Sequence, residues 1–599
     1  MNSSVSDRAV LSDQRTGKLA EQTVEAIQAT FERIGHDPTP AMWEALTAVA
    51  DTLDRMANNT ADPVVYVSSL DPGVGKTTTV IHFLKTLLTS NAHRGVSALV
   101  CVNRRDQIRS ITREASLSNA DFAVLTADAE LNALGCANPA KARVLFTTHS
   151  MVERRCEGKD FRSTSAFHYR GRPREVRIWD EAILPGRPLT ISRDDLGFLF
   201  KPLRSRQPEL ANDIEDLFRE LGRAVDGHLM MLPELDDIRD VPLNDALQIV
   251  DGGPADQVSA VETLWFLFGK TVTIRKDGVY GNTVLDYRDT LPDDIAPLLT
   301  LDASARVRAT YHLWKDRRGG MEMLPSASKR YDRHICHIWN QAGGKSAFRR
   351  YGQKLIDGIV KAILSRPSEE WLVVHHKNVG IDVPSSIMDL IPIHGPTVHF
   401  LNWGSHDATN QYAHVPNVIL AGTLFYRGSY YEALGRAAAA HPSARGEFPL
   451  EDAQAVIVGE NCHLILQALC RGAVRRCEDG GCPQTRTYII ASSRSNIANA
   501  LPLVLPGAKV ERWQPIEREL TGKVKCAFDF LVSRLADAAD RIVTFSEVQH
   551  HIACPDRSNF NRTIRNHGEF RQALSDEGIV EWGMGKRATG FKLERVEFG

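Results

Sequence analysis

Short hydrophobic runs, each followed by a polar or glycine-rich turn, recur along most of the chain. Such runs occupy 64–68, 98–102, 143–147 and 175–179, and segments with helical periodicity lie among them. Buried strands that alternate with helices are typical of a parallel sheet with helices on its faces. The pattern therefore predicts an α/β fold.

The alternation divides the chain into two α/β lobes and three other regions. It is interrupted after residue 183 and resumes near residue 296, so the first lobe is predicted to carry an α+β insert. Strands that begin at Trp371, Thr397 and Asn417 predict the second lobe. The predicted boundaries are an N-terminal helical region at 1–60, a first lobe at 61–183 and 296–330, the insert at 184–295, a second lobe at 331–515 and a C-terminal unit at 520–599.

The turn after the first strand has the composition of a phosphate-binding loop. Glycines at 73 and 75 allow backbone N–H groups to face phosphate oxygens at the start of the following helix. Lys76 is predicted to reach the β- and γ-phosphates, and the Thr77 hydroxyl to bind Mg²⁺. The P-loop pattern has a further glycine where this chain has Leu70. The predicted ATP-binding residues are Gly73, Val74, Gly75, Lys76, Thr77 and Thr78.

Two adjacent carboxylates, Asp180 and Glu181, follow the strand at 175–179. In open α/β sheets, ligands bind at the carboxyl ends of the strands. Asp180 is therefore predicted to bind Mg²⁺ together with Thr77, and Glu181 to orient the attacking water.

Charge and cysteine usage limit the class of protein. The 599-residue chain has a net charge of −2 and ten cysteines, with no CxxC pair. Scattered thiols favour a reduced, cytoplasmic setting over a disulfide framework. No signal-peptide core and no run of about 18 apolar residues is present, so we expect a soluble, cytoplasmic protein without a membrane partner. The near-neutral charge neither requires nor excludes nucleic acid.

Cysteines and histidines give weak metal signals. Cys470, Cys477 and Cys482 with His463 have loose spacing, and we expect no zinc there. His334, Cys336 and His337 alternate along a predicted strand, so they cannot all face one ion.

The ordered motifs over residues 40–495 resemble those of superfamily 2 DEAD/DEAH-type helicases, which have two RecA-like lobes. Gly73–Thr78 is similar to motif I, Asp180–Ile183 to the DEAD/DEAH box, and Asp302–Ala305 to motif III. Gln467–Arg475 resembles motif VI, with Cys470 in place of its glycine and the second arginine one residue late. Four further similarities are weaker. Cys101–Arg104 lies at the position of motif Ia, and Thr147–His149 resembles the nucleic-acid-contacting motif that follows it. His375–His376 falls at the position of motif IV, and Gly404–Gln411 is similar to motif V.

The resemblance implies that ATP and Mg²⁺ bind between the lobes. Gln467, Arg471 and Arg475 are then catalytic together with Lys76, Asp180 and Glu181, and the spacing leaves open which of Arg471, Arg475 and Arg476 reaches the γ-phosphate. Because Arg471 and Arg475 are four residues apart, we expect them on one helix face. The implied nucleic-acid contacts of the lobes are Asn103, Arg104, Thr148 and His149.

The insert lies where the XPD/DinG-like branch of these helicases carries its arch domain. That branch tends to hold an iron–sulfur cluster on four cysteines between motifs I and II. Only Cys101, Cys136 and Cys156 lie in that interval, so we expect no cluster.

The C-terminal unit resembles a winged helix domain. A predicted recognition helix at 556–566 carries Arg557, Arg562 and Arg565, and the wing tip carries Lys586 and Arg587. Such basic elements bind DNA grooves and backbone. Protein contact or packing on a lobe is the alternative use of the same fold.

The leading hypothesis is an ATP-dependent helicase or translocase with 5′–3′ or otherwise single-strand-tracking movement on DNA, which is favoured over RNA. A loading protein or nucleoprotein complex is the further partner. The alternative is an ATP-switched DNA-binding regulator that does not unwind, since the P-loop also resembles that of ParA-type partitioning ATPases. Those ATPases lack a second lobe with a segment like Gln467–Arg475. A viral packaging motor is disfavoured because no cluster of nuclease carboxylates lies near the C-terminus.

Overall fold

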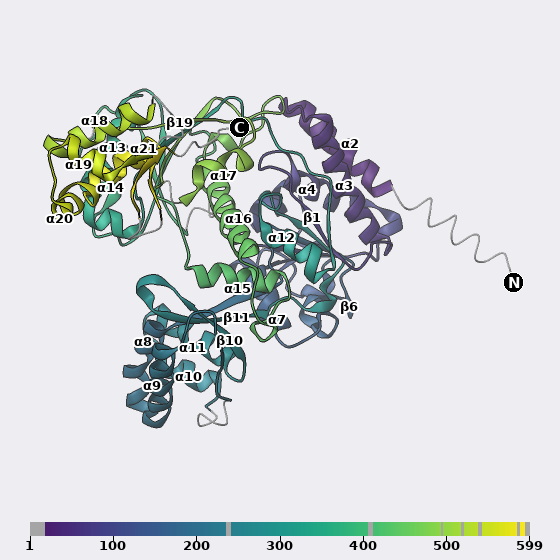
Figure 1. Cartoon of the computed structure of the whole chain (residues 1–599). Coiled ribbons are helices and arrows are strands. Elements are labelled where there is room, and N and C mark those ends of the chain that lie inside the picture. Colours follow the sequence, from purple (N-terminus) through teal and green to yellow (C-terminus); the bar gives the residue numbers. More distant parts are fainter. Residues whose placement is uncertain are drawn as a thin grey trace.

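Two parallel sheets form the body of the protein (Figure 1). The computed structural model describes residues 18–234, 241–404, 411–492, 495–516, 520–536, 542–583 and 588–593. The sheets have seven and six strands, an arrangement typical of tandem RecA-like lobes, and smaller antiparallel sheets accompany them. The predicted α/β class with two parallel lobes is confirmed.

The first sheet has the strand order β13-β1-β12-β7-β2-β4-β3. All residues of its central strands β1, β2, β7 and β12 are buried, which explains their continuous hydrophobic runs. Its strands are β1 (Val65–Ser68), β2 (Ala98–Val102), β3 (Phe122–Leu125), β4 (Val144–Thr148), β7 (Val176–Asp180), β12 (Leu298–Leu301) and β13 (Met321–Met323).

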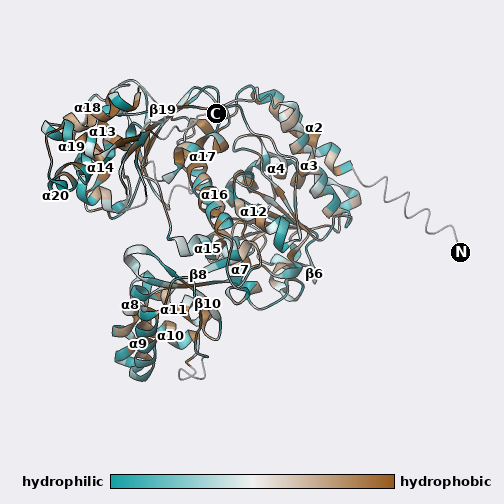
Figure 2. Cartoon of the chain, in the orientation of Figure 1, coloured by the Kyte–Doolittle hydropathy of each residue, from teal (hydrophilic) through white to brown (hydrophobic). Residues whose placement is uncertain are grey.

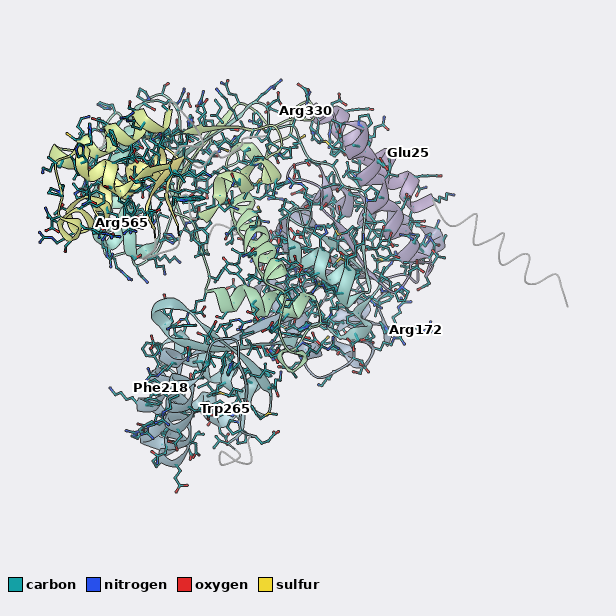
Figure 3. The ribbon with its side chains drawn as sticks, viewed as in Figure 1. Glu25, Arg172, Phe218, Trp265, Arg330 and Arg565 are labelled. Atoms are coloured by element: carbon teal, nitrogen blue, oxygen red, sulfur yellow. The ribbon has the colours of Figure 1, made fainter. Side chains whose placement is uncertain are left out.

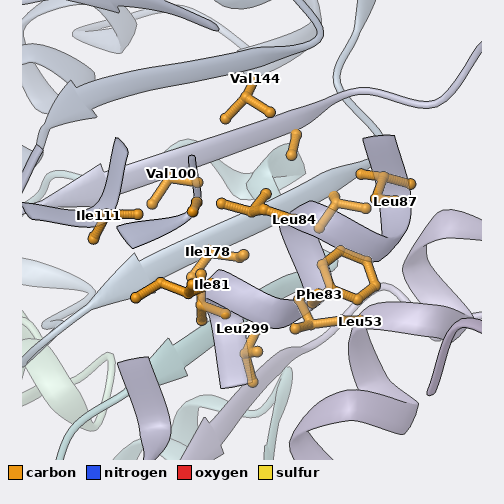
Figure 4. Close-up of a cluster of buried hydrophobic side chains, with 14 of the residues drawn as sticks. Leu53, Ile81, Phe83, Leu84, Leu87, Val100, Ile111, Val144, Ile178 and Leu299 are labelled. Atoms are coloured by element: carbon orange, nitrogen blue, oxygen red, sulfur yellow. The ribbon is translucent and has the colours of Figure 1, made fainter. Parts of the chain in front are cut away.

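Helices cover both faces of this sheet. On one face, Ile81, Leu84 and Leu87 of α4 (Lys76–Thr89) pack with Val100 and Ile178 of the strands (Figure 4). Helices α3 (Pro40–Ala57) and α5 (Arg105–Glu114) contribute to the same core. The opposite face is covered by α7 (His149–Cys156) and α12 (Ala309–Leu313), and α2 (Lys18–Ile34) packs against α3 and α4. The short elements of this lobe are α6 (Ala129–Asn132), β5 (His168–Tyr169) and β6 (Arg172–Pro173).

The second sheet has the order β16-β15-β17-β18-β14-β19. Helix α13 (Lys345–Leu364) packs on one face, and α16 (Leu450–Leu469) and α17 (Ile497–Val504) pack on the other. Buried residues of α16 and α17 form this core, and both helices include brown, hydrophobic segments in Figure 2. The other elements are β14 (His334–Trp339), β15 (Trp371–His375), β16 (Val398–Asn402), β17 (Asn417–Ala421), β18 (Thr485–Ile490), β19 (Lys509–Arg512), α14 (Val383–Met388) and α15 (Gly428–Ala438).

The insert is a separate α+β unit at the lower left of Figure 1. Its antiparallel sheet has the order β8-β11-β10-β9, and its own core includes Trp265, labelled in Figure 3. The sheet packs on α15 of the second lobe, where Arg275 donates two hydrogen bonds to Glu432 at 2.6 and 3.1 Å. The elements are β8 (Gly186–Ser192), α8 (Arg193–Arg206), α9 (Pro208–Arg223), β9 (Leu229–Met231), α10 (Leu243–Val250), α11 (Ala255–Leu267), β10 (Thr271–Lys276) and β11 (Asn282–Asp289).

The C-terminal unit combines four helices with a small antiparallel sheet of order β20-β22-β21. It packs on the second lobe through α21, where Gln572 donates to the Asn340 carbonyl at 2.6 Å and Lys354 pairs with Glu569 at 3.0 Å. Its elements are α18 (Gly522–Ala536), β20 (Ile542–Thr544), α19 (Phe545–His551), α20 (Arg557–Phe560), α21 (Gly568–Asp576), β21 (Ile579–Trp582) and β22 (Gly590–Leu593).

None of the helices in the described ranges is both long enough and apolar enough to cross a membrane.

Candidate nucleotide site between the lobes

A pocket between the two lobes gathers most of the residues that the sequence analysis assigned to ATP. The P-loop and the carboxyl ends of β7 and β12 form the first-lobe wall. The end of α16 and the segment after it form the second-lobe wall. The lining residues are Pro72, Gly73, Gly75, Lys76, Thr77, Thr78, Arg104, Gln107, Asp180, Glu181, Leu301, Asp302, Ala303, Gln467, Arg471 and Arg475.

Both P-loop glycines are required by close contacts as well as by backbone conformation. Gly73 has φ +85° and Gly75 has φ +126°, a region that favours glycine. A Cβ atom at Gly73 would lie 2.1 Å from the carbonyl oxygen of Arg475, in the opposite lobe. A Cβ atom at Gly75 would lie 2.5 Å from Cζ of Phe31 in α2. The loop is therefore enclosed by the second lobe on one side and by the N-terminal helices on the other.

Leu70 explains the departure from the P-loop pattern. Its side chain is fully buried in a cluster with Val74, Phe31 and Met42. The predicted nucleotide-binding residue Val74 thus contributes packing through its side chain. This buried apolar cluster attaches the loop to α2 and α3. Glycine at position 70 could not contribute to it, because glycine has no side chain.

Lys76 donates to the backbone carbonyl oxygens of Leu70 and Asp71, the latter at 3.2 Å. Burial lowers the pKa of its ammonium group to about 8, against the opposing effect of Asp71 and Asp180. A desolvated ammonium group beside a glycine-rich loop fits a phosphate ligand, which would supply the missing negative charge.

The carboxylates of β7 face the same pocket. Asp180 accepts a hydrogen bond from the Gln107 amide at 3.0 Å, and burial together with Glu181 raises its pKa to about 6. Glu181 adopts a left-handed φ of +79°, an uncommon conformation for a residue with a side chain. A buried carboxylate opposite Lys76 and the Thr77 hydroxyl is the oxygen-rich donor set that Mg²⁺ prefers.

Two residues predicted to contact nucleic acid, Asn103 and Arg104, contact Glu181 in this structure. The Asn103 amide donates to Glu181 at 2.9 Å, and Arg104 pairs with the same carboxylate at 3.4 Å. The sheet explains this placement, because β2 lies next to β7 and their carboxyl ends meet. Arg104 therefore lines the nucleotide pocket in this structure.

Thr148 and His149 also have local structural contacts. The Thr148 hydroxyl caps α7 by accepting from the Met151 N–H at 3.3 Å. The His149 ring stacks on Trp179 with 4.0 Å between centroids, and burial lowers its pKa to about 4. In this structure the His149 ring therefore packs on the sheet.

The predicted arginines come from a turn rather than from one helix face. Helix α16 ends at Leu469, so the expected helical spacing of Arg471 and Arg475 is wrong. Arg471 folds back to donate to the Gln467 amide oxygen at 3.0 Å, and Arg475 ends a short 3₁₀ turn, Ala473–Arg475. Arg476 pairs with Glu478 at 2.8 Å, outside the pocket lining. Of the three candidates, Arg471 and Arg475 face the nucleotide site.

A buried carboxylate that the sequence analysis did not select, Asp71, joins the P-loop to the segment between the lobes. It accepts from the Lys329 N–H at 2.9 Å, from the Tyr331 hydroxyl at 2.8 Å and from Arg306 at 2.9 Å. Arg306 also donates to the carbonyl oxygen of Val504 in α17 at 2.8 Å. The P-loop is thus hydrogen-bonded to the interlobe segment and, through Arg306, to the second lobe.

Lys329 holds the turn that bears Arg475. Its ammonium group, on a residue only 1% exposed, donates to the carbonyl oxygens of Val474, Arg475 and Arg476 at 2.8, 2.8 and 3.1 Å. We call the segment Ala473–Arg476, which carries these carbonyl groups, the arginine turn. No sequence signal identifies Lys329, because it stands in a polar stretch, Ser326–Arg330, that reads as solvent-exposed.

The motif III-like segment is bonded to the other lobe through α16. Arg308, which is 3% exposed, donates to both carboxylate oxygens of Glu460 at 2.8 and 2.9 Å. Its guanidinium also lies 3.4 Å from Asp302. The Ser304 hydroxyl lies 2.6 Å from Nδ1 of His463. His463 therefore serves this contact between the lobes rather than a site with the nearby cysteines.

The basic residues of the C-terminal unit divide into two groups. Arg557 and Arg562 are exposed. Arg565, labelled in Figure 3, donates to both oxygens of Glu581 at 2.8 and 2.6 Å and covers the Phe545 ring. In this structure Arg565 therefore makes its contacts within the unit. Lys586 and Arg587 lie outside the described residues, as do residues 405–410 of the motif V-like stretch.

No protein-family model and no curated protein matches the chain. Among solved structures, Xpd4 of S. tokodaii is 14% identical over 77% of this chain and 99% of its own, with a TM-score of 0.41. An XPD structure named XPD_APO is 14% identical over 78% and 99%, with a TM-score of 0.44. S. cerevisiae Dbp5 bound to RNA and ADP BeF3 is 9% identical over 80% and 95%, with a TM-score of 0.32.

Proposed function

We propose that this protein hydrolyses ATP between its two lobes and couples hydrolysis to movement on single-stranded nucleic acid, with DNA as the favoured track. One observation carries the proposal. A single pocket brings together a P-loop, two adjacent carboxylates of the same lobe and two arginines of the opposite lobe. Residues from both lobes around one phosphate site make hydrolysis sensitive to the distance between the lobes.

Each group has a role that its position allows. The N–H groups at Gly73–Thr78 and the Lys76 ammonium bind the phosphates. Thr77 and Asp180 would hold Mg²⁺, which neutralises charge on the phosphate oxygens. Glu181 orients the attacking water, and Gln467 positions Arg471 through their hydrogen bond. Arg471 and Arg475 stabilise charge that develops on the transferred group, an effect worth on the order of 10³–10⁵ in rate.

Movement would follow from the contacts that bridge the lobes. Ser304 and Arg308 of the first lobe bond to His463 and Glu460 of α16, the helix that also carries Gln467. A change at the phosphate site thereby reaches the second lobe through one rigid helix. Arg557 and Arg562 of the C-terminal unit, which we propose to be a winged helix, supply an exposed basic surface for duplex DNA.

Steady-state ATP hydrolysis with single-stranded DNA, single-stranded RNA or duplex DNA tests the proposal. We expect at least tenfold stimulation by single-stranded DNA, and about a hundredfold loss in Lys76→Ala. Lys85→Ala, on the same helix but outside the pocket, is the matched control and should retain activity. Equal hydrolysis with all three nucleic acids would rule out the motor.

An ATP-switched DNA-binding regulator is the second candidate. The packing of α21 on the second lobe favours it, because a change in that lobe would be felt directly by the C-terminal unit. ATP-dependent duplex binding without strand displacement would support this alternative, whereas displacement of a labelled strand would support the motor.

A further inference from the structure

Three potential metal ligands meet on the second lobe, away from the nucleotide pocket. Glu370 directly precedes β15, His399 is the second residue of β16, and His414 lies three residues before β17. Neighbouring parallel strands β15 and β16 set His399 opposite Leu372, and Glu370 shares the face of Leu372. Strand pairing therefore brings Glu370 and His399 together, and the loop before β17 supplies the third ligand.

Hydrogen bonds hold the three side chains near the spacing of metal ligands. The Nε2 atoms of His399 and His414 lie 3.0 and 3.3 Å from the same carboxylate oxygen of Glu370. One ligand atom from each of the three residues lies within 4.8 Å of the other two, and this is the only such group among the residues that the structure describes. A tetrahedral zinc ion with bonds of about 2.0–2.2 Å separates its ligand atoms by about 3.4 Å. To admit the ion, the two hydrogen-bond distances need to lengthen by a few tenths of an ångström, and the two histidine nitrogens, which lie at most 4.8 Å apart, need to approach the same separation.

The surroundings hold the ligands in place without competing for them. The Glu370 carbonyl accepts from the Asn417 amide at 3.1 Å, which fixes the backbone before β15. The Tyr412 ring packs beside His399 at 4.9 Å between centroids. Within the described ranges, no lysine or arginine pairs with Glu370. His414 is more than half exposed, so an ion can enter from solvent.

We propose that Glu370, His399 and His414 form a site for a divalent transition-metal ion, with Zn²⁺ as the first candidate and Co²⁺ and Ni²⁺ as substitutes. Two imidazoles and one carboxylate suit these ions, whereas Mg²⁺ and Ca²⁺ prefer oxygen ligands. Water would occupy the open position on the exposed side.

One neighbouring residue and one hydrogen bond connect the metal site to the arginine turn. His414 is bonded in sequence to Val415, whose carbonyl oxygen accepts from the Ala473 N–H at 2.8 Å. A metal ion that ties His414 to β15 and β16 would fix this acceptor, and with it the turn that carries Arg475. This consequence rests on the proposed ATP hydrolysis, whereas metal binding itself does not.

The test uses the tag-free full-length protein after chelator treatment. Titration with Co²⁺, followed by visible absorption, and with Zn²⁺, followed by calorimetry, should give one equivalent bound in the presence of millimolar Mg²⁺. His399→Ala, His414→Ala and Glu370→Gln should each weaken affinity at least tenfold. His394→Ala, an exposed histidine of the same lobe, is the matched control and should bind as wild type does.

Two further readouts keep the outcomes distinct. Zn²⁺ should raise the thermal midpoint of the wild type but not of His399→Ala, while the two chelated proteins should unfold alike. Binding retained in all three variants, or a cobalt–thiolate band in the near ultraviolet, would overturn the site and assign the ion to cysteines. Metal binding without any ATP hydrolysis would count against the proposed function alone. Metal binding with ATP hydrolysis that does not respond to the metal would overturn only the link to the arginine turn.

Discussion

Burial sets the charge state of individual side chains around the nucleotide pocket. Desolvation lowers the pKa of Lys76 and raises that of Asp180, so each charged form is disfavoured when no ligand is present. Phosphate oxygens would favour the charged amine, and a divalent cation would favour the charged carboxylate. This electrostatic arrangement supports the proposed function, because a bound nucleotide and a bound cation would each compensate a charge that the protein buries.

Buried neutral histidines predict that the protein loses stability in mild acid. Burial lowers the pKa of His334 to about 3. Its two ring nitrogens contact the Thr485 and Thr487 hydroxyls at 2.7 and 3.1 Å. Below the ordinary histidine pKa of about 6.5, the unfolded chain takes up a proton that the folded His334 does not. As the pH drops from 6.5 toward 3, the free energy of unfolding should therefore decrease. Each such histidine contributes a decrease of up to about 1.4 kcal/mol per pH unit.

The variant His334→Val removes the contribution of one histidine to this pH dependence of stability. We expect it to be less stable at pH 7.5, because both threonines lose a partner. Its thermal midpoint should also fall less steeply between pH 7 and 5 than that of the wild type. His312→Val, at an exposed position, should leave the pH dependence unchanged. Parallel curves for wild type and His334→Val would contradict the assignment.

At the scale of elements, the arginine turn depends on a lysine from another segment. Lys329→Met keeps most of the side-chain volume and removes the ammonium group that three carbonyls accept. The turn should relax by a fraction of an ångström to an ångström, and kcat for ATP hydrolysis should fall about tenfold to a hundredfold. Nucleotide affinity should change less than threefold, because Lys76 and the P-loop remain.

Comparing the change in kcat with the change in nucleotide affinity distinguishes a displaced arginine turn from a general loss of the fold. Lys361→Met, on the exposed side of α13, controls for the loss of a positive charge in the same lobe. A near-normal kcat in Lys329→Met would show that the arginine turn holds without the lysine. An equal loss of affinity and kcat would indicate a general defect of the pocket instead.

Elements made by continuous local patterns were accessible from the sequence. The strands β1, β2, β7 and β12 coincide with continuous hydrophobic runs that are fully buried. The P-loop comes after β1, and Asp180 stands at the end of β7. The features that the sequence could not reveal depend on tertiary contacts. The helix that was expected to carry both arginines ends at Leu469, and Asn103 and Arg104 turn toward Glu181 because β2 and β7 are neighbours. The roles of Asp71 and Lys329 need partners about 145 to 258 residues away, which no local pattern encodes.

At the scale of the molecule, the insert is joined to the second lobe by buried polar contacts. Glu432 of α15 accepts from Arg275 of the insert and from Arg436 of its own helix, in a nearly buried triad. Ser429 and Ser443 of the second lobe are bonded to Asp277 and Asp286 of the insert. The insert therefore contacts the second lobe, while its chain connections near Ile183 and Ile295 lead to the first lobe.

Among the contacts between the lobes, the ion pair between Arg308 and Glu460 is buried and lies beside the Ser304–His463 contact. Breaking a buried pair by removing one partner costs about 3–5 kcal/mol, whereas replacing both with apolar groups is often nearly neutral. Arg308→Met and Glu460→Leu should therefore each lower the thermal midpoint by several degrees. The double variant should recover most of that loss, because Asp302 keeps its bonds to Ser304 and Tyr311.

Activity should not recover with stability. An apolar contact restores packing but has no preferred direction, so α16 would no longer follow the motif III-like segment when the phosphate site changes. We expect stimulation of ATP hydrolysis by single-stranded DNA to be lost in both single variants and in the double variant, while basal hydrolysis persists. A double variant that regains stimulation together with its thermal midpoint would show that the pair only stabilises the interface. Loss of stimulation alone would assign communication between the lobes to this bidentate bond.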